Sequence, residues 1–153
     1  MTEIDQRRRA LSARLPELKI DALLVSAPAN VRYLTGFAGS NGILLITKDE
    51  SHFFTDPRYA LVATAQITCR VHIEKKALMV AAMAVIKRMR LKKIGFESSS
   101  LRYDDYTKVK EELPLGSGLQ PIGRIIEEQR MVKSAAEISL WVDETRRALG
   151  TGR

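Results

Sequence analysis

The side chains most able to bind a metal in this sequence are Cys69 and His72, which are spaced as C-x-x-H. Thiolate and imidazole groups are common zinc ligands, but no second pair completes a tetrahedral site. On a strand, side chains three residues apart point to opposite faces of the sheet. His52 stands alone in another predicted strand. We therefore predict structural roles for these residues and no metal ligand in the chain.

The sequence also shows no pattern of residues for hydrolytic catalysis. Neither histidine accompanies a glycine-flanked serine, so no nucleophile elbow or catalytic triad is indicated. Asp104 and Asp105 could be a carboxylate pair for acid–base catalysis. Acidic residues at the start of a helix also offset its dipole, and we favour that structural role. No catalytic residue is predicted.

Gly36, Gly39 and Gly42 are spaced as G-x-x-G-x-x-G, a pattern that could form a phosphate-binding loop. This spacing differs from the dinucleotide-binding and P-loop fingerprints, and the segment leads into a strand. No helix N-terminus is therefore directed at an anion. We expect these glycines to allow a tight turn and a close approach of the backbone.

The segment 55–59 contains the clearest helix start, because Asp56 can cap the helix and Pro57 suits its first position. Arg58 then places a cation in the first turn, where it opposes the helix dipole. Two interpretations stay open. Arg58 is a solvated surface residue, or it has a carboxylate partner on a ligand or another subunit.

Helix and strand patterns alternate along the chain, which predicts an α/β domain. Pro121 places the last strand at an edge of the sheet, because proline cannot donate to a central ladder. Ser134 and Glu137 form a capping box that opens the final helix, and Gly150 stops it. The expected helices are 3–15, 30–34, 57–66, 77–90, 103–113, 125–132 and 134–149, and the expected strands are 22–25, 43–47, 52–55, 69–73, 93–97 and 119–122.

Composition limits the function classes. With 45% hydrophobic and 28% charged residues in 153 positions, the chain is typical of one globular domain. The net charge of +7 lies in short clusters without interleaved aromatic residues, which argues against a nucleic-acid partner. No apolar run is long enough to span a membrane, and the acidic N-terminus argues against a signal peptide. With a single cysteine, we expect a cytoplasmic protein.

Three blocks of sequence occur in a fixed order. The first covers residues 30–37 and continues through 39–42, the second covers 55–59, and the third covers 127–138. Together they resemble the N-terminal domain of the Xaa-Pro aminopeptidase, prolidase and creatinase family, and the third is similar to the segment that joins this domain to the catalytic half. Each block is weak alone, but their combination over residues 4–139 is specific.

The resemblance implies that residues 1–132 form a mixed β-sheet flanked by helices, with a layout similar to ribonuclease H. It implies that residues 133–153 begin the linker helix to a catalytic "pita-bread" domain. In that domain, two divalent metals such as Mn²⁺ activate water to attack the bond before proline. The sequence does not include this domain, so we expect no cofactor and no peptidase activity in this chain.

The resemblance also implies roles for single residues and for the assembly. Arg58 takes the position of an arginine that is thought to reach the peptide substrate, and Tyr59 and Phe37 would line or support the same surface. The family's domain builds dimer contacts, so a homodimer is expected, and a proline-containing peptide would bind only to the full-length parent. The residues expected to build the motif are Asn30, Tyr33, Gly36, Gly39, Gly42 and Asp56.

Residues 141–153 depart from the family pattern, because they do not resemble the continuation of its linker helix. A shifted reading frame, a natural truncation and an artificial boundary all stay open. The favoured function is a non-catalytic domain with roles in oligomerisation and substrate access. The alternative is a stand-alone module that dimerises or binds a partner through the surface around Phe37 and Arg58.

Overall fold

A computed structural model describes residues 1–132 and 135–150 of the chain. The predicted capping box of Ser134 and Glu137, and the domain boundary placed at residue 133, lie outside the described residues or their side chains. The described elements are, in chain order, α1 (Glu3–Ser12), α2 (Leu15–Leu18), β1 (Ala22–Val25), α3 (Pro28–Thr35), β2 (Gly42–Thr47), β3 (Ser51–Thr55), the 3₁₀ turn η1 (Pro57–Tyr59), α4 (Ala60–Gln66), β4 (Arg70–Ile73), α5 (Leu78–Arg88), β5 (Lys93–Glu97), α6 (Tyr103–Glu112), β6 (Gly118–Ile122), α7 (Ile125–Met131) and α8 (Ala135–Ala148).

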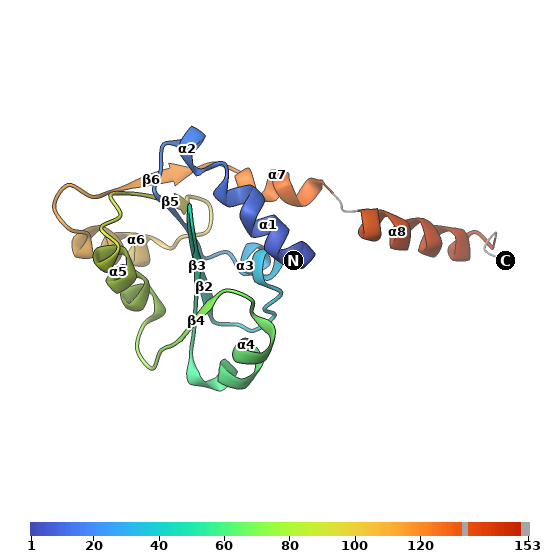
Figure 1. The fold of residues 1–153 in the computed structure, drawn as a ribbon, viewed down its shortest axis with the longest axis horizontal. Coiled ribbons are helices and arrows are strands. Elements are labelled where there is room, and N and C mark those ends of the chain that lie inside the picture. The colour runs from blue at the N-terminus through green and yellow to red at the C-terminus, as the bar shows by residue number, and fades with distance from the viewer. Residues whose placement is uncertain (133–134, 151–153) are drawn as a thin grey trace.

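Six strands form one mixed sheet in the order β4-β3-β2-β1-β5-β6. The pairs β1–β2 and β2–β3 are antiparallel, and the pairs β3–β4, β1–β5 and β5–β6 are parallel. Helices cover both faces: Figure 1 shows α5 and α6 on one side of the sheet and α1, α3 and α4 on the other. The predicted mixed sheet flanked by helices is confirmed, and so is the position of β6 at an edge.

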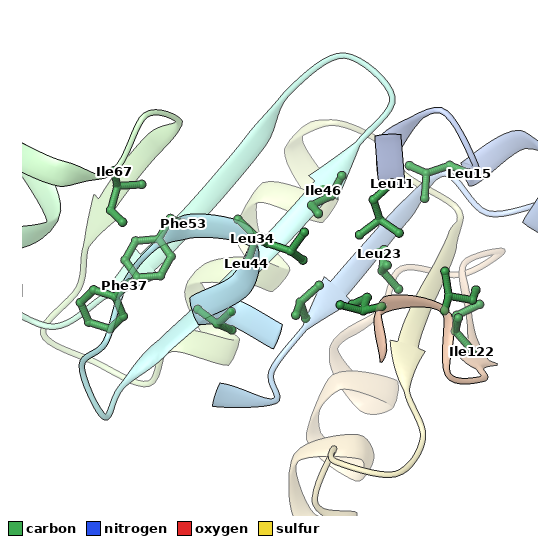
Figure 2. Packing of buried hydrophobic residues seen from close by; sticks show 14 of the residues in the cluster. Leu11, Leu15, Leu23, Leu34, Phe37, Leu44, Ile46, Phe53, Ile67 and Ile122 are labelled. Carbon is green, nitrogen blue, oxygen red and sulfur yellow. The ribbon is translucent and has the colours of Figure 1, made fainter. Parts of the chain in front are cut away.

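Each face of the sheet buries its own apolar cluster because side chains alternate between faces along every strand. Leu23, Leu44 and Phe53 face α1 and α3, where they pack with Leu11 and Leu34 (Figure 2). The opposite cluster joins the other strand residues to the apolar side of α5 and to α6. β1 is buried on both faces, as its continuous apolar run predicts.

The first helical segment is shorter than the sequence pattern predicts. Instead of one helix over 3–15, α1 ends at Ser12 and the four-residue α2 follows. Pro16 explains the break, because proline inside a continuous helix removes a backbone hydrogen bond and clashes with the preceding turn. Ser12 then uses its hydroxyl to donate to the carbonyl oxygens of Thr47 and Lys48, both at 2.8 Å, which ties the end of α1 to the β2–β3 turn.

The last helix differs from the others. α8 extends away from the sheet and its covering helices (Figure 1). Its apolar side chains are exposed, including Ile138, Leu140 and Trp141. Arg146 and Arg147 lie in its last turn, where cations offset the helix dipole as expected. No helix among the described residues is long and apolar enough to cross a membrane.

Candidate functional site

The candidate site begins with a carboxylate that holds an exposed cation. Asp56 caps η1, because its Oδ1 accepts a hydrogen bond from the Arg58 amide at 2.9 Å. The same carboxylate binds the Arg58 guanidinium in a bidentate manner, with Nε to Oδ1 at 3.0 Å and Nη2 to Oδ2 at 2.9 Å. Asn41 donates a further hydrogen bond to Oδ2 at 2.8 Å. The hydrogen bonds from Arg58 and Asn41 hold the pKa of Asp56 well below its usual range.

Neither of the two interpretations left open for Arg58 included a partner within the chain, and the structure supplies one. Its carboxylate partner is Asp56, two residues earlier, and this ion pair offsets the unfavourable position of a cation at the start of η1. The Arg58 side chain is nevertheless 68% exposed. Asp56 raises the Arg58 pKa through a hydrogen bond, so the guanidinium stays charged and is presented to solvent in a fixed orientation.

Tyr59 stands beside Arg58 and is held on two sides. Its hydroxyl lies 2.8 Å from the Ser40 hydroxyl and accepts a hydrogen bond from the Ser40 amide at 3.1 Å. These two contacts lower the Tyr59 pKa. Its ring meets that of Phe37 edge to face, with centroids 5.1 Å apart, and Phe37 in turn packs against Phe53 at 4.8 Å. Phe37 is only 2% exposed, so it supports this surface from behind and does not line it.

The glycine segment allows this packing. Gly36 ends α3 with a φ of 80°, a left-handed conformation that disfavours other residues. Gly39 lies against the two rings, and a Cβ atom there would stand 2.3 Å from Phe37 Cζ and 2.8 Å from Tyr59 Cε1. Gly42 has the same role against Phe53, at 3.0 Å. The predicted close approach of the backbone is therefore confirmed.

A second network joins the first sequence block to α7. Asn30 is 1% exposed and donates to the buried carboxylate of Glu97 and to Glu127 Oε1, the latter at 2.9 Å. The side-chain oxygen of Asn30, Oδ1, accepts a hydrogen bond from Arg130 Nη1 at 3.1 Å. The Tyr33 hydroxyl donates to the backbone oxygen of Gln129 at 3.3 Å. Asn30 and Tyr33 therefore hold α7, the last described helix before residue 133, against α3.

The structure brings together residues that the sequence analysis treated separately. Arg58, Tyr59, Asp56, Phe37 and Gly39 form one cluster, whereas Asn30 and Tyr33 belong to the network around α7. Three contributors had escaped notice: Ser40 and Asn41, which lie inside the first block, and Glu97, which ends β5. The position of Asn41 next to Gly42 within that block could have marked it as a site residue. Nothing in the sequence near Glu97 indicates that it takes part in the network.

The two histidines also require a correction, because His52 does not stand alone. Its Nδ1 lies 2.9 Å from His72 Nε2, and its Nε2 lies 2.8 Å from Glu50 Oε1. Cys69 packs on the opposite face of the sheet from His72, as the strand periodicity predicts. Among residues 1–132 and 135–150, no group of three or more His, Cys, Asp or Glu side chains could hold a metal ion.

Comparison with known proteins identifies relatives of this domain. Residues 7–132 match the family described as "Creatinase/Prolidase N-terminal domain". The chain is 33% identical over 125 residues to the "Uncharacterized peptidase YqhT" of Bacillus subtilis, an alignment that covers 81% of this chain and 35% of the relative. It is 28% identical over 109 residues to a "Putative Xaa-Pro aminopeptidase" of Mycoplasma pneumoniae, with 71% of this chain and 31% of the relative covered. The chain thus spans about a third of the length of these relatives.

Solved structures agree with this assignment. The Xaa-Pro dipeptidase from Bacillus anthracis superposes with a TM-score of 0.83 at 26% identity, over 90% of this chain and 38% of the dipeptidase. The N-terminal domain of the cytoplasmic peptidase PepQ from Mycobacterium tuberculosis H37Rv superposes with a TM-score of 0.75 at 31% identity, over 80% of this chain and 97% of that domain. The similarity therefore covers one whole domain of longer proteins.

Proposed function

The chain belongs to the creatinase/prolidase N-terminal domain family of Xaa-Pro peptidases, and from this membership we propose that it acts as the non-catalytic N-terminal domain of a metal-dependent Xaa-Pro peptidase, of the aminopeptidase P or prolidase type. The relatives that it matches are more than twice its length, which leaves room for a separate catalytic domain. Two divalent metals, such as Mn²⁺, would belong to that domain. We place the full-length protein in the cytoplasm as a homodimer.

The observation that carries this proposal is the presentation of Arg58. A guanidinium that is 68% exposed is held by two hydrogen bonds to Asp56, and Asp56 is itself held by Asn41. An exposed arginine side chain normally loses rotamer freedom when it binds a ligand, and this arrangement reduces that loss. Arg58 is suited to bind the carboxylate of a proline-containing peptide at an active site that another domain or subunit supplies.

The test compares two arginines in the full-length peptidase that carries this domain. Arg58→Gln should lower kcat/KM for an Xaa-Pro peptide about tenfold or more, because one charge-assisted interaction with the substrate is lost. Arg70→Gln is the matched control: Arg70 is also 68% exposed and also pairs with a carboxylate, Glu50, but lies on β4. Equal kinetics in both variants would contradict a substrate role for Arg58. Efficient hydrolysis by the isolated 153-residue chain would contradict the non-catalytic assignment.

The alternative function, a module that dimerises or binds a partner by itself, is favoured by one observation. Next to Arg58, α4 exposes Leu61 at 88% and Val62 at 46%. Exposed apolar side chains beside a charged group are common at protein interfaces. Sedimentation of the isolated chain over a range of concentrations tests this function. A dimer that Leu61→Lys dissociates supports the module, whereas a monomer at all concentrations, together with no partner in a pull-down, contradicts it.

A further inference from the structure

The sheet has a switch point between β1 and β5. These strands are adjacent and parallel, so their carboxyl ends lie at the same edge. The helix that follows β1 is α3, which packs on the face with Leu23 and Leu44, while α6 follows β5 and packs on the opposite face (Figure 1). Where adjacent parallel strands send their connections to opposite faces, the chain leaves a crevice, and α/β proteins bind ligands there.

A cavity of about 200 Å³ occupies this position. Its wall includes Ser26 and Pro28, which follow β1, and the segment 100–102, which follows β5. The loop 39–42 closes a further side on its way into β2. Pockets for drug-sized ligands measure about 300–1,000 Å³, so this cavity suits a smaller molecule.

The cavity wall contains one cation and one anion that have no side-chain partner among the described residues. Arg102 is exposed at the N-cap position of α6, and Asp105 is half-buried in the first turn of the same helix. Neither side chain makes a hydrogen bond or an ion pair within the described part of the chain, and they do not pair with each other. This contrasts with Arg58, whose charge is matched by Asp56.

The remaining wall is hydroxylic and apolar. The Ser26 hydroxyl oxygen is buried and has no hydrogen-bond partner among the described residues, although buried hydroxyl groups normally have one. Val31, Met79 and Leu101 supply apolar surface. A ligand that complements this wall carries a negative group, a positive group and a short apolar part.

We propose that this cavity is a binding site for a free α-amino acid with a small apolar side chain, such as alanine or proline. Arg102 binds the α-carboxylate, Asp105 binds the α-ammonium group, and the side chain of the ligand packs against Met79 and Leu101. The site shares loop 39–42 with the surface around Arg58, but its two charged groups come from the start of α6, and its occupancy does not rest on the proposed peptidase function.

The test uses the chain as it is, with amide chemical shifts in ¹⁵N-labelled protein as the readout. L-alanine and L-proline should shift the amides of Ser26, segment 100–102 and loop 39–42 in a saturable manner. N-acetylalanine lacks the ammonium group and alaninamide lacks the carboxylate, so each should bind about tenfold or more weakly than alanine. The absence of a saturable shift with either amino acid, or binding of both blocked compounds as tight as that of alanine, overturns the proposal without any variant.

Two pairs of variants locate the site. Arg102→Gln and Asp105→Asn should each weaken binding about tenfold. Arg124→Gln is the matched control for the first, because Arg124 is also an exposed arginine at the N-cap position of a helix, α7. Asp104→Asn is the control for the second, since Asp104 is exposed in the same turn of α6 but does not line the cavity. An equal loss of binding in variants and controls would show that binding depends only on the overall charge of the surface, and it would overturn the assignment.

Discussion

Replacement of Gly39 by alanine tests whether the site depends on close packing of two aromatic rings. The added Cβ atom would stand 2.3 Å from Phe37 Cζ, 2.8 Å from Phe37 Cε1 and 2.8 Å from Tyr59 Cε1, all closer than real Cβ contacts. Gly39 has no left-handed φ, so a new backbone strain does not contribute. The whole effect of Gly39→Ala should therefore come from this steric contact.

The size of the effect follows from how little the rings can move. Phe37 is 2% exposed and packs on Phe53 with centroids 4.8 Å apart, so its ring cannot retreat without displacing the core. Overpacking of a core by one carbon atom costs about 1–3 kcal/mol. Because two rings meet the new atom, we expect the upper half of this range. For a domain of this length each kcal/mol lowers Tm by about 2–4 °C, so Tm should fall by about 4–12 °C.

The assay is thermal and urea unfolding of Gly39→Ala beside Gly118→Ala. A Cβ atom at Gly118 meets nothing within 4 Å, and Gly118 also lacks a left-handed φ. The control should be neutral or more stable by up to about 1 kcal/mol, because alanine restricts the unfolded chain. Equal stability of the two variants would refute the close-approach argument, and so would a loss in Gly118→Ala as large as that in Gly39→Ala.

Further predictions concern the other polar clusters. Asn30→Ala should lower the free energy of unfolding by about 2–4 kcal/mol in urea, since Glu97 stays buried with only the Ser26 and Ala27 amides as donors; a loss below about 1 kcal/mol would contradict this. Burial and His52 lower the pKa of His72 below its usual 6.5, so the unfolded chain takes up the proton more readily and stability should fall as the pH drops below about 6.5. When unfolding curves are recorded at a series of pH values, His72→Gln should abolish this loss of stability at low pH. An unchanged pH dependence in the variant would show that His72 is not responsible for the loss. Addition of Mn²⁺ or of EDTA should shift Tm by less than about 1 °C. A metal stabilises a fold only by binding to it, and the described residues contain no cluster of three or more metal ligands.

Local chemistry explains which elements could be predicted from the sequence. β1 and β5 were predicted with their observed bounds. For β1 the reason is that a short buried strand is a continuous apolar run between turn signals. Asp56 and Pro57 correctly marked the start of η1. The break after Ser12 was missed, because Leu11 and Leu15 have helical spacing and both bury in the same cluster. They do so from two separate helices.

The site was harder to predict, since its contacts depend on pairing between distant segments. The family blocks identified Arg58 and Tyr59 but not the pairing of Arg58 with Asp56, because that contact depends on a side chain that folds back onto its own helix cap. The contact between His52 and His72 exists only in the register of β3 against β4, where Phe54 lies opposite His72. No pattern within either strand specifies that register.

The order of strands in the sheet has a consequence for synthesis of the protein. β1, β2 and β3 are consecutive in the chain and adjacent in the sheet, so they can pair as soon as residues 22–55 have left the ribosome. The other edge of β1 must wait for β5, which emerges only after α4, β4 and α5. During that interval β1, whose four residues are all buried in the finished fold, is an open apolar edge. Such open edges can pair with other chains. The domain is therefore most prone to aggregate during synthesis, after β3 has emerged and before β5 has emerged.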